Sequence, residues 1–271
     1  MYTNLLIDNQ DGIVVVTLNR PKALNALNGQ TLAELHQFFT KDALAIEGLK
    51  GVILTGAGEK SFVAGADISE FMLIKGAEGA SFAQRGHSIF FAIERFHRPV
   101  VAAVNGYALG GGCELAMSAH IRVAGEKARF GQPEVNLGIL PGYGGTQRLI
   151  QLIGKGKAVE LMMTADMIGA EEAKQLGLVT HVVPVGEEVA KAKEIIQKIA
   201  TKGPVAISKV IEAVNAYFDY NSDGFGAEVN AFGDLTQTAD FKEGASAFLE
   251  KRKADFKGCL LYTSPSPRDR G

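Results

Sequence analysis

The order of elements along the chain predicts an α/β protein built from successive strand–strand–helix units. Short apolar runs such as 52–55 and 100–104 read as buried strands, and they alternate with segments whose apolar residues recur at helical spacing. Glycine-rich turns separate these segments, and the 32 glycines have no fixed period, which excludes collagen-like and linker sequences. We therefore expect one large α/β core with a smaller appendage.

The first 55 residues predict a hairpin, a helix and a buried strand. Residues 5–18 contain two apolar runs around an Asp-Gly dipeptide, which is typical of a tight hairpin turn. A helix is expected over 29–44, because Leu32, Leu35 and later apolar residues lie on one face. The continuous apolar run 52–55 predicts a strand that is covered on both faces.

The next part of the chain predicts a loosely held segment and then a second strand–loop–helix unit. Residues 69–86 mix apolar residues with three glycines, so we expect a weakly held, mobile segment ahead of a helix over 87–96. The unit that follows consists of strand 100–104, a glycine loop, a helix that reaches residue 119, and strand 120–124.

A loop rich in proline and glycine, 131–145, separates this unit from a mainly helical part of the chain. The elements expected after the loop are helices 146–153 and 155–163, a short helix 170–176, strand 179–183 and a long amphipathic helix 187–201.

The composition along the chain predicts three parts. Residues 1–202 form the catalytic core, and residues 203–257 form an all-helical region that begins at Pro204. Residues 258–271 change abruptly to a sequence rich in Thr, Ser, Pro and Arg. This tail cannot bury a core, so we expect it to be disordered, and its abrupt onset is typical of a foreign cloning or sequencing scar.

Composition and charge limit the function classes. The formal net charge is −2 and the globular part has no basic block, which argues against a nucleic-acid partner. No apolar run is long enough to span a bilayer. Cys113 and Cys259 form no disulfide framework, and the five histidines have no ligand spacing, so we expect no metal. A reducing compartment, and thus a cytoplasmic location, is favoured, although a trimmed mitochondrial protein would read the same.

The stretch 104–145 carries the most chemical information. Three consecutive glycines, 110–112, join an apolar strand to a helix and leave backbone N–H groups free to approach a ligand. Glu114 follows directly, and Glu134 lies twenty positions later. Two carboxylates near one loop of donor amides make an acid/base pair, of which burial should raise the pKa of one member.

Simpler interpretations exist for each of these residues taken alone. A glycine run at a strand–helix junction is commonly a structural turn, and a single glutamate is commonly a surface residue. The run lacks the G-x-G-x-x-G pattern of dinucleotide-binding proteins. Cys113 has no His or Asp partner placed for nucleophilic catalysis, so we interpret it as a small buried thiol.

Several motifs together resemble the crotonase (enoyl-CoA hydratase/isomerase) family, and within it the short-chain enoyl-CoA hydratases. The resemblance runs in order from about residue 5 to residue 257. The motifs that carry it are NRPKALNAL at 19–27, GADI at 65–68, GGGCELAM at 110–117, FGQPE at 130–134, PGYGGTQRL at 141–149 and AFLEKRK at 247–253.

This resemblance implies a spiral of repeated ββα units with a C-terminal helical trimerisation region, assembled as a homohexamer that is a dimer of trimers. It also implies an oxyanion hole in which the backbone N–H groups of Ala66 and Gly111 hold the thioester carbonyl. Fixed donors aimed at a developing negative charge are worth a few kcal/mol each.

The resemblance further implies the roles of the two glutamates. Glu114 would activate the attacking water and Glu134 would protonate Cα on the same face of a 2-enoyl-CoA, without a metal or redox cofactor, because CoA is part of the substrate. The positions expected to bind CoA are Lys22, Ala64, Ala66, Asp67, Ile68 and Gly111, together with Phe248 and Lys251 reaching CoA on an adjacent subunit.

Two alternatives remain open within this resemblance. An enoyl-CoA isomerase or another acyl-CoA lyase is disfavoured by the presence of both Glu114 and Glu134, and a catalytically silent RNA-binding member by the near-neutral charge. One departure from the family pattern is His120, where the family usually has Asp. We interpret it as a tolerated change at a helix end, the alternative being altered hydrogen bonding behind the helix that carries Glu114.

Overall fold

The computed structural model describes residues 2–72, 76 and 78–258, so the tail expected to be disordered lies outside the described residues except for Gly258. The chain divides into two compact units, Met1–Gln197 and Lys198–Gly271. The division falls in the last turn of helix α8 (Glu188–Ile199). Each unit is described separately below.

The first unit contains a six-stranded sheet in the order β1-β2-β3-β5-β7-β10. β1 and β2 form an antiparallel hairpin, and the remaining neighbours pair in parallel. At the hairpin turn Asp11 and Gly12 have φ angles of 52° and 82°, the two left-handed residues that a type I′ turn requires. The strands are β1 (Leu5–Gln10), β2 (Ile13–Leu18), β3 (Gly51–Gly56), β5 (Val100–Val104), β7 (Ile121–Gly125) and β10 (His181–Val183).

A second sheet of four short strands has the order β4-β6-β8-β9. Its strands are β4 (Ser61–Val63), β6 (Tyr107–Leu109), β8 (Arg129–Gly131) and β9 (Met167–Gly169), of which only β9 is antiparallel to its neighbour. β4, β6 and β8 each follow a long strand of the first sheet (β3, β5 and β7) along the chain. The chain therefore winds between two sheets in repeated strand–strand–helix units, which confirms the predicted fold class.

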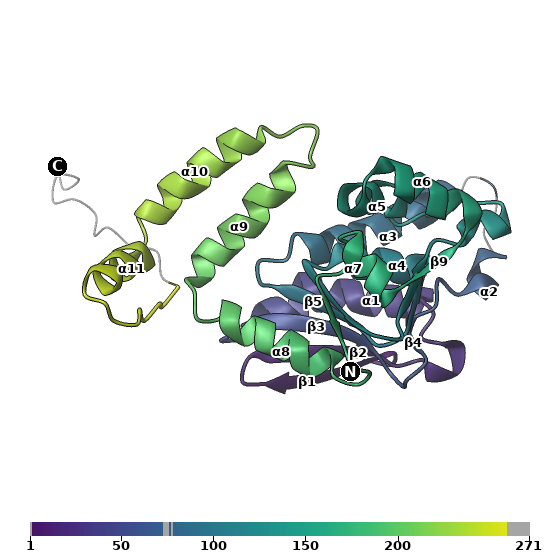
Figure 1. Cartoon of the computed structure of the whole chain (residues 1–271), viewed down its shortest axis with the longest axis horizontal. Coiled ribbons are helices and arrows are strands. Elements are labelled where there is room, and N and C mark those ends of the chain that lie inside the picture. Colours follow the sequence, from purple (N-terminus) through teal and green to yellow (C-terminus); the bar gives the residue numbers. More distant parts are fainter. Residues whose placement is uncertain (1, 73–75, 77, 259–271) are drawn as a thin grey trace, which may run out of the picture. The chain divides into compact units, whose positions relative to one another are not determined.

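Helices cover both faces of the larger sheet. One face packs against α8 through Ala192 and Ile196, and the other face packs into the main core with α1, α3 and α4. Figure 1 shows α8 beside β1–β3. The helices of this unit are α1 (Gly29–Gln37), α2 (Ile68–Phe71), α3 (Glu78–Glu94), α4 (Gly111–Ser118), α5 (Gly145–Ile153), α6 (Lys155–Thr164), α7 (Ala170–Gln175) and α8.

The prediction that a helix begins near residue 87 is wrong, because α3 already begins at Glu78. We expected the glycines of 69–86 to mark a weakly held segment, yet Gly86 is buried inside the helix. A Cβ at Gly86 would lie 2.0 Å from the ring of Tyr143, so this glycine provides close packing. Part of the segment that was expected to be mobile, residues 73–75 and 77, lies outside the described residues.

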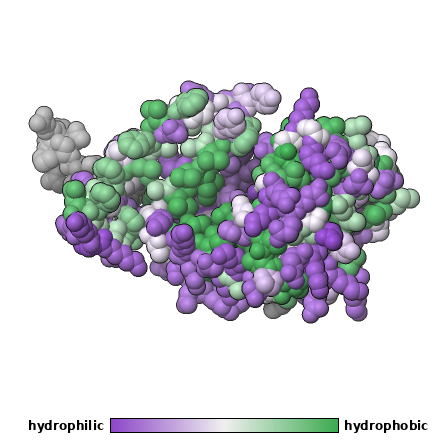
Figure 2. Space-filling view, viewed as in Figure 1, coloured by the Kyte–Doolittle hydropathy of each residue, from purple (hydrophilic) through white to green (hydrophobic). Residues whose placement is uncertain are grey.

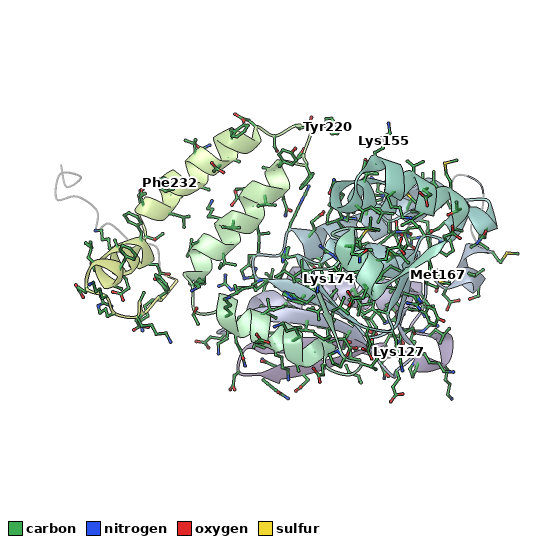
Figure 3. All side chains as sticks on the ribbon, in the orientation of Figure 1. Lys127, Lys155, Met167, Lys174, Tyr220 and Phe232 are labelled. Atoms are coloured by element: carbon green, nitrogen blue, oxygen red, sulfur yellow. The ribbon has the colours of Figure 1, made fainter. Side chains whose placement is uncertain are left out.

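The described part of the second unit contains three helices joined by short turns. It contains α9 (Pro204–Ala216), α10 (Gly224–Thr236) and α11 (Ala239–Leu249), and α9 packs against α10. Figure 2 shows hydrophobic residues gathered over α9 and α10. Tyr220 in the turn after α9 and Phe232 on α10 project from this unit (Figure 3).

Candidate active site

The glycine run fixes the start of α4 against the second sheet. Gly110 has φ 49° and ψ −123°, a conformation that only glycine adopts without strain. Its N–H donates to the carbonyl of Gly131 over 2.9 Å, which ties the run to β8. A Cβ at Gly112 would lie 1.9 Å from the carbonyl oxygen of Val63, so α4 approaches β4 more closely than any other residue would allow.

Two backbone N–H groups lie close to each other at this helix start. Gly111 is the first residue of α4, so its N–H has no acceptor within the helix. Ala66 pairs with Leu27 in an isolated parallel bridge. In this bridge the N–H of Leu27 donates to the carbonyl of Gly65, and the N–H of Asp67 donates to the carbonyl of Leu27. The nitrogen of Ala66 lies 3.5 Å from the position that a Cβ on Gly111 would occupy. Among the described residues neither N–H donates to an acceptor, and the helix dipole at this end favours an anion.

Glu114 is held rigidly one turn into α4. Its side chain is buried, and the residue is only 1% exposed. Oε1 accepts hydrogen bonds from the N–H groups of Tyr143 (2.8 Å) and Gly145 (2.7 Å) in the turn that leads into α5. No hydrogen bond to Oε2 is found in the described part of the chain, so that oxygen is the one available to a ligand.

Glu134 lies against the same glycine run. It begins a short 3-10 helix, Glu134–Leu137, directly after Pro133. A Cβ at Gly110 would lie 2.8 Å from its Oε1, so the carboxylate lies against the start of α4. With its amide nitrogen turned toward Glu134, Gln132 donates to both carboxylate oxygens over 3.0 and 3.1 Å.

Burial raises the pKa of both carboxyl groups to about 7. For Glu114, the hydrogen bond from Gly145 lowers the pKa and the nearby charge of Glu134 raises it further. For Glu134, burial is the main cause, and a hydrogen bond from its own backbone N–H acts in the opposite direction. Two neighbouring groups that both titrate near neutral pH can hold one proton between them, which provides one acid and one base.

The segment expected to bind CoA converges on Gly111 through its backbone. The N–H of Ala64 donates to the carbonyl of Leu24 over 3.1 Å. The carboxylate of Asp67 pairs with Arg20 at 2.8 Å and caps α2 through Ser69. Ser69 and Arg20 lower the pKa of Asp67. The carboxylate of Asp67 is therefore committed to this segment, and the exposed side chain of Ile68 follows it.

The remaining CoA-binding candidates lie further along the surface. Lys22 is exposed in the 3-10 turn Pro21–Ala23. Phe248 and Lys251 lie at the end of α11 in the second unit, where Phe248 is largely exposed. Lys22 thus belongs to the first unit, and Phe248 and Lys251 belong to the second.

His120 forms two hydrogen bonds behind α4. Its Nδ1 accepts from the N–H of Val100 and its Nε2 faces the carbonyl of Glu94, both over 2.9 Å. This pairing requires a neutral ring with the proton on Nε2, and burial lowers the pKa of His120 accordingly.

Sequence reasoning missed the groups that hold the two glutamates. The amides of Tyr143 and Gly145, and the amide of Gln132, lie inside motifs that were identified for other reasons. A backbone N–H carries no sequence signal of its own, and the glycines at 144 and 145 were the only indication of a special turn. Among the described residues no group of three His, Cys, Asp or Glu side chains could hold a metal ion. None of the described helices has the length and apolarity needed to cross a membrane.

Comparison with known proteins gives consistent results over most of the chain. Residues 8–259 match the family described as enoyl-CoA hydratase/isomerase. A short-chain-enoyl-CoA hydratase of Clostridium acetobutylicum is 49% identical over 253 residues, 93% of this chain and 97% of that protein. A crotonyl-CoA hydratase of Syntrophomonas wolfei is 47% identical, covering 94% and 98%. The crystal structure of an enoyl-CoA hydratase from Bacillus anthracis superposes with a TM-score of 0.88 at 40% identity, covering 95% of this chain and 100% of that one.

Proposed function

This chain belongs to the enoyl-CoA hydratase/isomerase family, and from that premise we propose that it is an enoyl-CoA hydratase. The reaction is the reversible syn addition of water across the 2,3 double bond of a short-chain trans-2-enoyl-CoA, such as crotonyl-CoA to 3-hydroxybutyryl-CoA. The observation that carries the proposal is the pair of carboxyl groups at the start of α4, with Glu114 buried and Glu134 half-buried, beside two N–H groups that have no acceptor among the described residues.

The N–H groups of Ala66 and Gly111 act as the oxyanion hole. Water adds at C3 of the enoyl thioester only if negative charge accumulates on the thioester oxygen. Two preorganised donors at a helix start stabilise that charge in the transition state. Their proximity, and the lack of an acceptor for either N–H among the described residues, support this role.

The two glutamates then move the protons. Ionised Glu114 takes a proton from water through Oε2 while the water oxygen bonds to C3, and protonated Glu134 gives its proton to C2. Exchange with solvent restores the starting proton distribution, and the reverse steps perform dehydration. Oε1 of Glu114 is fixed by two N–H groups, so Oε2 keeps a constant direction toward the reacting water.

The substrate binds as its CoA thioester. The backbone of Ala64 to Ile68 lines the path of CoA, and Lys22 approaches its phosphates. The reaction transfers no electrons and so needs no redox cofactor, and the two N–H groups stabilise the thioester oxygen without a metal ion, so we propose neither. The near-neutral charge supports a small-molecule substrate without a nucleic-acid or membrane partner, and we propose a cytoplasmic location, where acyl-CoA thioesters are available.

We also propose that the chain assembles as a homohexamer, a dimer of trimers. Apolar residues on α9 and α10 remain exposed in the isolated chain, and exposed apolar patches of this kind mark protein interfaces. In the assembly, Phe248 and Lys251 reach CoA bound to an adjacent subunit.

The test follows the loss of conjugated enoyl absorbance when crotonyl-CoA is added to the wild type, Glu114→Gln and Glu134→Gln. We expect rapid loss with the wild type and a decrease of about 10²- to 10⁴-fold in either variant. If the wild type shifts the double bond of a 3-enoyl-CoA to the 2-position but does not hydrate crotonyl-CoA, the protein is an isomerase instead. A wild type that binds CoA and does neither would refute the proposal.

A further inference from the structure

A buried guanidinium group lies under the turn that holds Glu114. Arg148, in the first turns of α5, is 4% exposed. Its Nη1 donates to the carbonyl of Tyr143 over 2.9 Å. A Cβ at Gly144 would lie 2.3 Å from the same nitrogen, so a glycine at this position is what allows the guanidinium to reach the turn.

Glu94 at the end of α3 fixes the other side of this guanidinium. Nε and Nη2 of Arg148 donate to the two carboxylate oxygens of Glu94 over 3.1 and 2.9 Å. The ring of Phe91 lies 5.1 Å from the guanidinium carbon. A two-pronged pair of this geometry defines the orientation of both side chains, and removing one partner would leave the buried Arg148 without its counter-charge.

His120 secures the backbone of Glu94. Through its two ring nitrogens it connects the carbonyl of Glu94 to the N–H of Val100 at the start of β5. An aspartate at this position could accept from Val100 but could not donate to Glu94. The end of α3, the start of β5 and the guanidinium of Arg148 are therefore joined by hydrogen bonds.

These contacts converge on Glu114. The N–H groups of Tyr143 and Gly145 both donate to Oε1 of Glu114, and the carbonyl of Tyr143 is held by Arg148. We propose that Arg148 is a positioning residue for Glu114, oriented by Glu94 and His120. This inference rests on the proposed hydratase function, in which Glu114 must direct Oε2 at the reacting water.

Arg148 also belongs to the electrostatic environment of Glu114. The charged groups that act on this carboxyl are Glu134, which raises its pKa, and Arg148, which lowers it. The thiol of Cys113 and the hydroxyl of Tyr143 border the same site, and burial raises the pKa of both, so they stay neutral. His87 lies beside Gly144 in the same turn, and burial and the charge of Arg148 lower its pKa. Removing the charge of Arg148 should therefore make Glu114 harder to ionise.

The experiment compares the wild type with Arg148→Lys, Arg148→Met and Glu94→Gln on crotonyl-CoA over a range of pH. We expect kcat to fall about 10²-fold in Arg148→Met with KM changed less than about threefold. Arg148→Met should also move the acid limb of the kcat profile to higher pH, whereas Arg148→Lys should lower kcat and keep that limb. A raised KM at unchanged kcat, or an unmoved acid limb in Arg148→Met, would overturn the proposal.

Arg122→Met is the matched control. Arg122 is equally buried, but it donates to the carbonyls of Ala116 and Ala119 at the opposite end of α4. We expect this variant to lose stability and to keep the acid limb of the wild type. An acid limb that moves equally in Arg122→Met would show a general effect of removing a buried arginine and would overturn the positioning role.

A second readout separates this inference from the proposed function. The titration of Glu114, measured by carboxyl infrared or NMR spectroscopy with Glu114→Gln as the reference, requires no activity. If the wild type does not hydrate crotonyl-CoA, the hydratase proposal fails. A higher pKa of Glu114 in Arg148→Met would still show that Arg148 acts on Glu114. If Arg148→Met does not fold, Glu94→Gln replaces it, and unchanged kcat in that variant would refute the role of the ion pair.

Discussion

At the scale of single residues, the site depends on two carboxyl groups whose ordinary pKa values are displaced toward neutrality. Burial is the main cause for both Glu114 and Glu134, and for Glu114 the neighbouring charge adds to it. Because the two groups interact, the pair titrates as a unit. Near pH 7 its dominant active form carries one proton, which is what an addition needing both a base and an acid requires.

The first prediction concerns the pH dependence of activity. The kcat/KM of the wild type should be greatest near pH 7, because Glu114 loses its charge below this range and Glu134 loses its proton above it. Glu134→Gln should keep only the acid limb, displaced to lower pH because the charge that raises the pKa of Glu114 is gone. Rate profiles of crotonyl-CoA hydration would check this, and a surviving alkaline limb in Glu134→Gln would assign the acid to another group.

The second prediction concerns stability. The folded-state pKa of Glu114 is about 7, against an ordinary value of 4.5, so the folded protein binds more protons than the unfolded chain between these values. Its contribution to stability is present below about pH 4.5 and is lost as pH rises through about 7. Glu114→Gln should therefore stabilise the protein at pH 8 by on the order of 1–3 kcal/mol and little at pH 5.

Urea unfolding at both pH values, at equal protein concentration, measures this difference. The exposed Glu59→Gln is the matched control and should change stability by less than about 0.5 kcal/mol at either pH. A Glu114→Gln variant that is less stable than the wild type at pH 8 would contradict the burial argument.

At the scale of elements, α4 is the helix on which the site is built. Its first turn is pressed against β4 at Gly112, and its last carbonyls accept hydrogen bonds from the buried Arg122. A cation at a helix C-terminus complements the helix dipole. Burial lowers the pKa of Arg122 to about 10, which still leaves it charged at neutral pH. Both ends of α4 are thus fixed before any ligand binds.

The third prediction tests the glycine contact. Gly112→Ala places a methyl group where the carbonyl oxygen of Val63 already lies, so α4 must shift away from β4. We expect a loss of about 1–3 kcal/mol of stability from overpacking and a larger loss of activity, because Gly111 and Glu114 move with the helix. Gly156→Ala in α6 is the control, since nothing lies within 4 Å of its added Cβ, and it should be neutral or slightly stabilising.

Thermal unfolding measures the stability of the two variants, and the rate of crotonyl-CoA hydration measures their activity. Equal stability of Gly112→Ala and Gly156→Ala would mean that α4 tolerates the displacement.

The elements also show what a sequence can predict. Long strands and the Asp11-Gly12 hairpin were predicted correctly, because period and turn chemistry are local properties. Strands such as β4 and β6 have three residues each, too few for a period, and their partners come from distant parts of the chain. Gly86 was misread because its packing against Tyr143 involves residues 57 positions apart. Glu114 and Glu134 were predicted from motifs and lie against the same glycine run, while their catalytic roles remain predictions.

At the scale of the whole molecule, the family and fold that the motifs implied are confirmed by the match over residues 8–259 and by the similarity to solved enoyl-CoA hydratase structures. The network around Arg148 could not be predicted, because it joins α3, β5 and α5 only after folding. The isolated chain also leaves a large apolar surface uncovered in its second unit. Three residues on α10, at spacings of four and three, are 85%, 70% and 67% exposed: Phe225, Val229 and Phe232.

A matching row of exposed apolar residues consists of Val210 and Val214 on α9 and Tyr217 directly after it. Such spacing places each row on one helical face, and a soluble helix normally buries a face of this kind. Because α9 and α10 pack against each other and these rows still remain exposed, another surface is needed to cover them. A second copy of this chain is the occupant that the proposed trimer provides.

The last prediction tests this surface by placing a charge in it. Val214→Glu and Val229→Glu should each weaken assembly by several kcal/mol, about the cost of burying an unpaired charge, and should yield smaller species in analytical ultracentrifugation. Asn230→Glu adds the same charge to an exposed polar position on α10 and should preserve the wild-type assembly.

If Phe248 and Lys251 contact CoA on an adjacent subunit, the dissociated variants should also show a raised KM for crotonyl-CoA, while the titration of Glu114 stays unchanged. Full assembly in both valine variants would mean that the rows on α9 and α10 lie outside the interface. Dissociation with an unchanged KM would separate the assembly from CoA binding, because each subunit would then hold its substrate with its own residues alone.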